Sequence, residues 1–128
     1  MSPTARQEAH RRDVEREAWP RLLESVKRGQ AIQEYESAAL RAHAMDLAPS
    51  DPTDRARTLV WVAVGQSSLQ REIVEHALVA AASAGHVSVA VDVAHVLAAS
   101  DWWPWWAVRG VLQGIAWKLD ALCSGDSP

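Results

Sequence analysis

The chain contains no phenylalanine, no asparagine and only one tyrosine, although it has seven tryptophans. It also has a single cysteine, Cys123, so no internal disulfide can form, which is typical of a reducing compartment. The net charge of −3 gives no general attraction to nucleic acid or to acidic membranes. These absences predict a cytoplasmic protein that does not bind a specific nucleic acid.

Long hydrophobic runs and targeting signals are also missing. The longest uncharged run, Ala77 to Val91, is interrupted by Gly85 and His86 and is too short to span a membrane comfortably. The first ten residues are polar, which argues against a secretory signal. We therefore expect no transmembrane segment and interpret the uncharged run as part of a core.

What the chain does contain is typical of one globular domain. Its 128 residues are 48% hydrophobic and 23% charged, which suits a single helical domain over residues 1–128 with frayed ends at about 1–4 and 124–128. Eleven arginines stand against two lysines, a bias expected of a GC-rich bacterial genome. The same bias can explain part of the excess of tryptophan over phenylalanine.

Apolar residues at helical spacing predict two helices in the first half of the chain. One covers residues 5–28, with an interruption at Pro20 and an end near Gly29, and the other covers residues 30–48. The apolar positions are Ala9, Val14, Ala18, Leu22 and Val26 in the first, and Ile32, Tyr35, Ala39, Ala42 and Met45 in the second.

Capping signals predict where the next two helices begin and end. Asp51 can cap a third helix with Pro52 in its first position, and that helix should stop near Gly65. Ser67 and Gln70 have the spacing of a capping box for a fourth helix, which Gly85 can end. The expected core positions of that fourth helix are Leu69, Ile73, Ala77, Leu78 and Ala81.

Residues 86–100 carry two competing patterns. Val87, Val89, Val91 and Val93 alternate as in a strand, whereas Ser88, Asp92, His95 and Ala99 fall on one stripe of a helix. We favour the helix and keep as the alternative an α+β fold with strands near 59–64 and 87–93.

A last helix is predicted over 104–123. Its apolar stripe consists of Trp105, Val108, Leu112, Ile115, Leu119 and Leu122. The predicted fold is thus an all-α bundle of five or six helices, centred on 67–84, 86–100 and 104–123.

Four tryptophans fall within six residues, namely Trp102, Trp103, Trp105 and Trp106. The pattern leaves open whether they fill a core corner or form a recognition surface. Trp105 and Trp106 point about 100° apart on a helix, which makes both hard to bury in one small core. Trp102 and Trp103, just before Pro104, are predicted to be extended and to point in opposite directions. At least one indole should therefore be partly exposed, and these four residues are our candidates for an interface or ligand site.

Ala81, Gly85 and Val91 have the spacing of a helix-turn-helix motif. The second helix would offer Ser88, Asp92 and His95 but no arginine, lysine, asparagine or glutamine to a base edge. We therefore interpret the motif as an ordinary turn between antiparallel helices. Gly110-x3-Gly114 in the last helix would likewise allow a close helix approach, although this motif is specific only in membranes.

Three predicted helices pair a histidine with a carboxylate on one face, which is how metal sites in bundles are built. The pairs are His43 with Asp46, Glu72 with His76, and Asp92 with His95. The Glu-x-x-His repeat of di-iron bundles is absent, so we assign no metal ligands and keep Glu72, His76, Asp92 and His95 as weak candidates only. For Asp92 and His95 we expect either mutual contact or a shared polar cavity, because a buried carboxylate needs a partner.

Signals of catalysis are few. No glycine-rich phosphate loop occurs, and Asp120 near Cys123 would disfavour a thiolate there. We therefore expect no catalytic residues and no cofactor. The predicted function is a small non-enzymatic module that binds a protein partner, or a second copy as a homodimer, through a tryptophan-rich surface. The alternative is a helical bundle that binds a small molecule or a metal.

Overall fold

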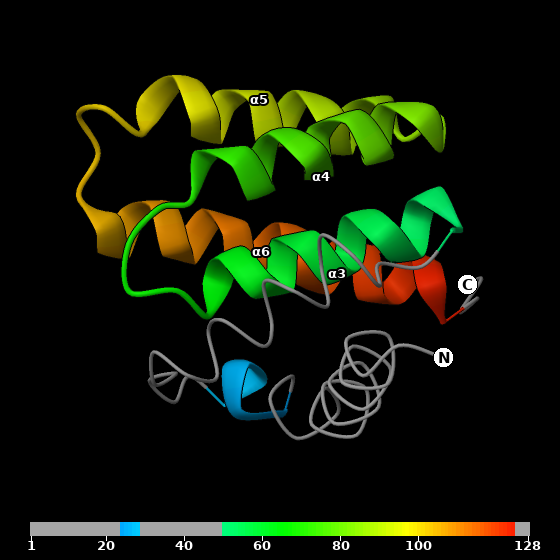
Figure 1. Cartoon of the computed structure of the whole chain (residues 1–128), viewed down its shortest axis with the longest axis horizontal. Coiled ribbons are helices and arrows are strands. Elements are labelled where there is room, and N and C mark those ends of the chain that lie inside the picture. Colours follow the sequence, from blue (N-terminus) through cyan, green and yellow to red (C-terminus); the bar gives the residue numbers. More distant parts are fainter. Residues whose placement is uncertain (1–23, 29–49, 125–128) are drawn as a thin grey trace, which may run out of the picture.

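The computed structural model describes residues 24–28 and 50–124, and this part of the chain contains helices and no strand. The helices are α3 (Pro52–Val64), α4 (Arg71–Ser83), α5 (Val87–Ala99) and α6 (Trp105–Cys123), preceded by one short helical segment at residues 24–28 (Figure 1). The all-α prediction is confirmed. The strands proposed near 59–64 and 87–93 are wrong, because both segments lie within helices.

The four long helices alternate in direction and form a bundle. α3 packs against α4 and α6, α4 packs against α5, and a smaller contact between α5 and α6 completes the bundle (Figure 1). Short loops join neighbouring antiparallel helices, as expected of this architecture. The C-terminal end of α6 therefore lies beside the N-terminal end of α3, and the loop from α5 to α6 lies at the opposite end of the bundle.

α3 is the most deeply buried helix. It begins as its sequence predicts, since the Asp51 carboxylate accepts a hydrogen bond of 3.0 Å from the Asp54 backbone N–H and Pro52 occupies the first turn. It ends at Gly65. Residues 58–64 are all buried, as expected where the second half of the helix is apolar on every side. The prediction that 67–84, 86–100 and 104–123 form the centre of the bundle is therefore wrong, because the apolar residues 58–64 place α3 there instead.

Gly85 makes the turn between α4 and α5. Its φ of 81° is left-handed, and the backbone N–H groups of Gly85 and His86 bond back to the carbonyls of Ala82 and Ala81. This Schellman-type ending confirms the role predicted for Gly85. The capping box predicted from Ser67 and Gln70 is wrong, because α4 begins at Arg71 and its N-cap, Gln70, makes no side-chain capping bond.

Residues 87–99 form a helix although their valines alternate. Val89, Val93 and Val96 are buried, whereas Val87 and Val91 are exposed. The alternating valines therefore lie on two faces of one helix, one against the core and one toward solvent.

Four of the core positions predicted for α6 are also confirmed. The buried residues of α6 are Val108, Leu112, Ile115, Ala116 and Leu119. Leu122 is exposed instead.

The helices predicted over 5–28 and 30–48 lie outside the described residues, apart from residues 24–28. In that short segment Val26 is buried in the common core, as its predicted apolar stripe requires. Within the described ranges, every helix is too short or too polar to cross a membrane.

Candidate functional site

The predicted tryptophan cluster lies at the surface, at the end of the bundle where α5 connects to α6. Trp102 and Trp106 are 76% and 77% exposed and Trp103 is 36% exposed, whereas Trp105 is partly buried against the core. This arrangement confirms that the four indoles do not all fit inside. We call Trp102, Trp103 and Trp106 the tryptophan corner.

Local hydrogen bonds hold the tryptophan corner in place. The backbone N–H groups of Trp102 and Trp103 both donate to the Ala99 carbonyl, and the Trp102 indole donates to the Ala98 carbonyl at 3.3 Å. The rings of Trp102 and Trp103 lie edge to face, with centroids 6.4 Å apart. The prediction that these residues are extended and point apart is wrong, because the chain turns back on the end of α5.

An exposed ion pair ties the same loop to α4. Arg71 Nη2 lies 2.7 Å from Asp101 Oδ1 and also donates to the Leu97 carbonyl at 3.3 Å. The loop that carries Trp102 and Trp103 thus contacts α4 as well as the end of α5.

A second group of interacting side chains surrounds Asp120, and the sequence did not predict it. The Asp120 carboxylate accepts a hydrogen bond from the indole of buried Trp61 and lies 2.9 Å from Lys27 Nζ and 3.6 Å from Arg57 Nη1. Lys27 Nζ also lies 5.4 Å and 5.6 Å from the ring centroids of Trp61 and Trp117. We call this group the Asp120 junction.

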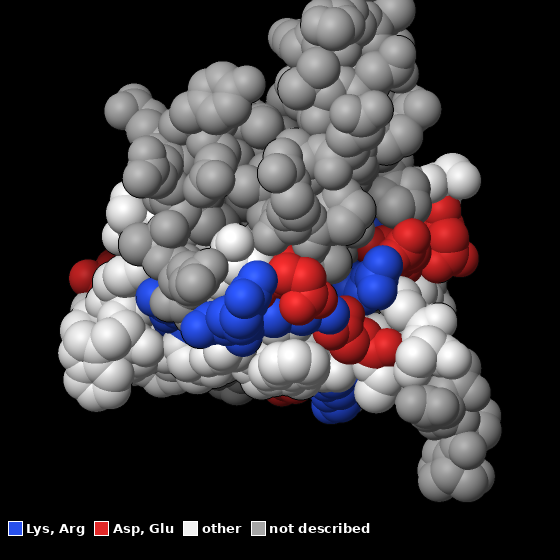
Figure 2. All heavy atoms as spheres, turned by 90° about the horizontal axis from the view of Figure 1, so that it is seen from below, with Lys and Arg blue, Asp and Glu red and all other residues white. Residues whose placement is uncertain are grey.

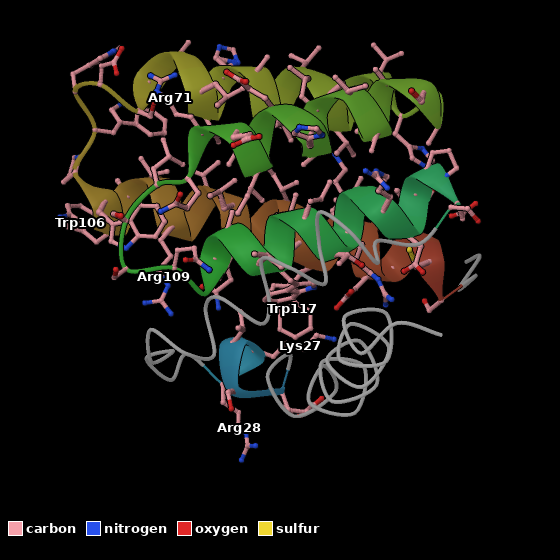
Figure 3. All side chains as sticks on the ribbon, in the orientation of Figure 1. Lys27, Arg28, Arg71, Trp106, Arg109 and Trp117 are labelled. Carbon is pink, nitrogen blue, oxygen red and sulfur yellow. The ribbon has the colours of Figure 1, made fainter. Side chains whose placement is uncertain are left out.

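The Asp120 junction joins α3, α6 and the segment 24–28. The two rings of Trp61 and Trp117 meet edge to face with centroids 5.2 Å apart, and Figure 3 shows Lys27 beside Trp117. Basic and acidic side chains lie next to one another in a belt across this side of the molecule (Figure 2). On this side of the described surface, positive and negative charges therefore offset one another in part.

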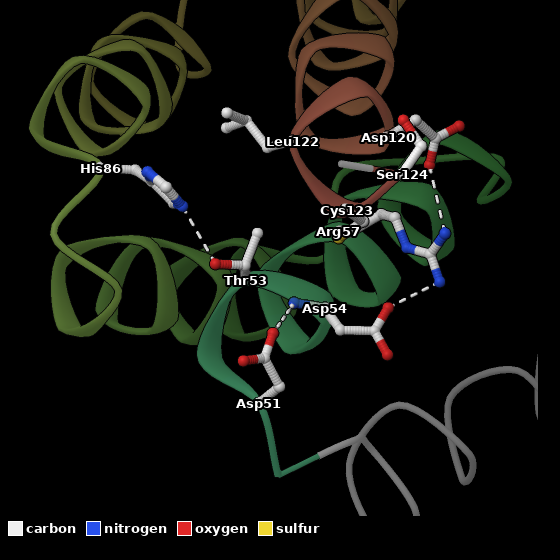
Figure 4. A pocket seen from close by; sticks show the side chains of 9 residues that line it. All are labelled: Asp51, Thr53, Asp54, Arg57, His86, Asp120, Leu122, Cys123 and Ser124. Carbon is white, nitrogen blue, oxygen red and sulfur yellow. Dashed lines mark hydrogen bonds and ion pairs between the residues drawn. The ribbon is translucent and has the colours of Figure 1, made fainter. Parts of the chain in front are cut away.

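A pocket opens at the end of the bundle remote from the tryptophan corner, where α3, α6 and the α4–α5 turn meet (Figure 4). Its volume is about 600 Å³. The lining residues are Asp51, Thr53, Asp54, Arg57, His86, Asp120, Leu122, Cys123 and Ser124. Thr53 Oγ1 lies 2.9 Å from His86 Nε2, and Asp54 Oδ1 lies 2.6 Å from Arg57 Nη2 in an ion pair that lacks the geometry of a hydrogen bond.

The chemistry of this pocket does not suit a cysteine nucleophile. Burial raises the pKa of the Cys123 thiol; the positive charge of Arg57 opposes this rise, and the carboxylates of Asp54, Asp120 and Asp51 add to it. A raised pKa keeps the thiol protonated and weakly nucleophilic. This direction agrees with the expectation that Asp120 near Cys123 disfavours a thiolate there.

The histidine–carboxylate pairs do not form sites in the described part of the chain. Glu72, His76 and His95 are exposed, and Asp92 is half-exposed, 3.8 Å from Lys118 across the α5–α6 contact. The expectation that Asp92 and His95 interact is therefore wrong, because a lysine on the neighbouring helix is the closer partner. Within residues 24–28 and 50–124, no three His, Cys, Asp or Glu side chains are placed to hold a metal. His43 and Asp46 lie outside these residues.

Helical spacing shows which members of the Asp120 junction share a helix face, but it does not show that the faces of α3 and α6 meet. Arg57 and Trp61 are four residues apart on α3, and Trp117 and Asp120 are three apart on α6, so each pair shares one face. Recognising that the two faces meet requires the packing of α3 on α6. That packing depends on the whole bundle and not on either segment.

No family model, curated protein or solved structure matches this chain. Within the described residues, the tryptophan corner and the pocket are the surface features that bear on function.

Proposed function

We propose that this protein is a small non-enzymatic interaction module that binds a protein partner through the tryptophan corner. The observation that supports this proposal is the exposure of three indoles within residues 102–106, two of them more than three-quarters exposed, where α5 connects to α6. Clustered exposed apolar surface on a folded protein marks binding sites, whereas single exposed apolar residues need no explanation. The single cysteine supports a cytoplasmic location as part of the same proposal.

The composition of the corner resembles the centre of a protein interface. Tryptophan and arginine are the residues most enriched among those that dominate binding energy, and they are usually surrounded by a polar rim. Here Asp101, next to Trp102 in the chain, forms an ion pair with Arg71, and Arg109 follows Trp106 by three residues on α6. The hydrogen bonds that fix Trp102 reduce the ordering cost on binding.

The described surface gives less support to recognition of nucleic acid. The exposed residues of α5 include Val87, Ser88, Val91 and His95, with Asp92 half-exposed beside them. None of these makes the bidentate contacts to guanine or adenine that sequence-specific proteins use, and Asp92 would repel phosphate. The proposal is therefore for a protein partner.

The test is affinity capture with variants of the corner and a matched control. Trp102→Ser/Trp106→Ser removes the two most exposed indoles, whereas Val79→Ser/Val87→Ser removes two similarly exposed apolar side chains from α4 and α5. We expect a partner that the wild-type chain and the valine variant retain and the tryptophan variant loses. If both variants lose the same captured proteins, or if neither variant loses any, the result contradicts a specific role for the tryptophan corner.

A second candidate function is the binding of a small organic cation in the pocket of Figure 4. Three carboxylates line that pocket, and because Arg57 and Lys27 pair with those of Asp54 and Asp120, the carboxylate of Asp51 is the negative charge in excess. Thermal melting with simple diamines tests this candidate, and we expect a rise in melting temperature. Asp51→Asn is the matched variant, because asparagine caps a helix as well as aspartate does while the pocket loses one negative charge. Equal shifts in both proteins would contradict binding there.

A further inference from the structure

The ammonium group of Lys27 lies against three side chains of α3 and α6. Its Nζ is 5.4 Å from the ring centroid of Trp61, 5.6 Å from that of Trp117 and 2.9 Å from Asp120 Oδ2. The two rings are perpendicular and their centroids are 5.2 Å apart, so they form two walls of one site. We call Trp61, Trp117 and Asp120 the ammonium cage, and Figure 3 shows Lys27 beside its Trp117 wall.

The ammonium cage has the chemistry that proteins use to bind organic cations. An indole face is the most favourable aromatic surface for a cation within about 6 Å of the ring centroid, and groups of such rings recognise ammonium ligands. The Asp120 carboxylate adds a negative charge and a hydrogen-bond acceptor. A surface ion pair requires the carboxylate alone, whereas here two indole rings also face the same cation.

The two oxygens of the Asp120 carboxylate have different partners. Oδ1 accepts the hydrogen bond from Trp61 Nε1 and lies 3.6 Å from Arg57 Nη1, whereas Oδ2 faces Lys27. Trp61 and Arg57 belong to α3, so they continue to orient the carboxylate when Lys27 is replaced. The ammonium cage is therefore built by α3 and α6, and Lys27 enters it from the segment 24–28.

The ammonium cage is deep at one wall and open at the other. Trp61 is fully buried, Trp117 is 50% exposed, and the side chain of Lys27 is 23% exposed. Solvent therefore reaches the position of the Lys27 side chain. A small amine can follow the same path once that side chain is shortened.

We infer that the ammonium cage is a binding site for a primary alkylammonium group, which Lys27 occupies as a tethered ligand and which an external amine can occupy in its place. The inference goes beyond the proposed function and does not depend on it, because the ammonium cage shares no residue with the tryptophan corner. Tethering gives Lys27 an effective concentration of about a millimolar or more, so an external amine competes poorly for the site in the wild-type chain.

Thermal melting of Lys27→Ala with n-propylammonium chloride tests the inference. This amine replaces the end of the side chain that the variant lacks. We expect Lys27→Ala to melt at least about 3 °C below wild type, and about 10–50 mM propylammonium to restore at least half of that loss. Sodium chloride at the same concentration should restore none of it.

Lys118→Ala is the matched control. Lys118 is the second of the two lysines in the chain and lies exposed, 3.8 Å from Asp92 and outside the ammonium cage. In this variant and in wild type, propylammonium should change the melting temperature no more than sodium chloride does.

A second substitution in the Lys27→Ala background locates the bound amine. Trp117→Leu removes one wall of the ammonium cage at a half-exposed position, and Trp106→Leu removes an exposed indole from the same helix outside the cage. We expect the Trp117 change to weaken the restoring effect of propylammonium at least about tenfold, on the scale of one desolvated cation–π contact. The Trp106 change should leave the effect intact, and equal weakening by both would overturn the assignment to this site.

Methylation of the probe tests the part played by Asp120. Propyltrimethylammonium keeps the positive charge but has no N–H to donate to Oδ2. We expect it to restore less of the lost melting temperature than propylammonium does at the same concentration. Equal restoration by the two probes would contradict a site for primary ammonium groups.

The inference is overturned if propylammonium restores nothing, or if Lys27→Ala, Lys118→Ala and wild type all gain the same melting temperature. If Lys27→Ala is unfolded in buffer, propylammonium should restore its helical circular dichroism, and failure to do so also overturns the inference. The proposed function survives either result, because capture by the tryptophan corner is measured with Lys27 intact. A rise that wild type shares and that Asp51→Asn reduces supports the pocket of Figure 4 and contradicts the ammonium cage.

Discussion

The indole Nε1 of Trp61 donates a hydrogen bond to the Asp120 carboxylate, with 3.1 Å between the nitrogen and Oδ1. This bond joins α3 to α6, which are the first and the last of the four long helices in the sequence. The other oxygen of the same carboxylate is 2.9 Å from Lys27 Nζ, which attaches the segment 24–28 to both helices. A single side chain thus connects three parts of the chain that are far apart in sequence.

Asp120→Ala should lower the free energy of unfolding by about 2–3 kcal/mol. The Asp120 side chain is largely buried, and its loss leaves the Trp61 N–H without its acceptor and the charges of Lys27 and Arg57 without their shared partner. Urea denaturation measures the change. Asp92→Ala is the control, because Asp92 is half-exposed and 3.8 Å from Lys118, and its removal should cost no more than about 0.5 kcal/mol. Similar losses in the two variants would contradict a central role for Asp120.

Gly85→Ala should destabilise the protein by about 1–2 kcal/mol, because alanine is strained at the φ of 81° that Gly85 adopts between α4 and α5. Gly114→Ala should have the opposite effect and raise stability by up to about 1 kcal/mol, since position 114 is helical and has open space around its Cβ. Both values come from denaturation in dilute solution. A stabilising Gly85→Ala would show that the turn does not depend on the left-handed conformation.

Much of the bundle could be predicted from local signals. The Asp51-Pro52 start of α3, the glycine that ends α4 and the apolar stripe of α6 each depend on residues close in sequence. The capping box predicted at Ser67 does not form, because the helix begins only at Arg71 and Gln70 is its N-cap. The alternating valines of residues 87–93 were ambiguous because apolar residues can also lie exposed on a helix, as Val87 and Val91 do.

The candidate site could be predicted only in part. Exposure of the tryptophan corner followed from the 100° between Trp105 and Trp106 on a helix. The Asp120 junction could not be predicted, because it depends on which face of α3 meets which face of α6 and on the placement of Lys27. The expected contact between Asp92 and His95 failed for the same reason: helical spacing does not show that Lys118 on a neighbouring helix is the nearer partner.

Cys123 should react slowly with alkylating reagents near neutral pH. Burial raises the pKa of its thiol, and the Asp54, Asp120 and Asp51 carboxylates add to this effect. The alkylation rate of the folded protein should therefore reach its midpoint at a higher pH than that of the urea-unfolded chain. Because the folded state holds the proton more tightly, the contribution of this group to stability is complete below the unfolded pKa and is lost as the pH rises through the folded pKa. The Cys123→Ser variant should lack this decrease, and a midpoint at lower pH in the folded protein would contradict the prediction.

Trp61→Ala and Trp106→Ala should differ sharply, although both remove an indole from a helix. Trp61 is fully buried between α3 and α6, so its truncation should cost about 3–5 kcal/mol. Trp106 is mostly exposed, and its truncation should change the stability of the monomer by no more than about 0.5 kcal/mol. Urea denaturation followed by far-ultraviolet circular dichroism measures both, since tryptophan fluorescence itself changes with the mutations. Trp61→Phe should recover part of the loss, because it keeps an aromatic ring against Trp117 but cannot donate to Asp120. A large loss at Trp106 would mean that this indole belongs to the folded core, and it would remove the main support for an interaction surface at the tryptophan corner.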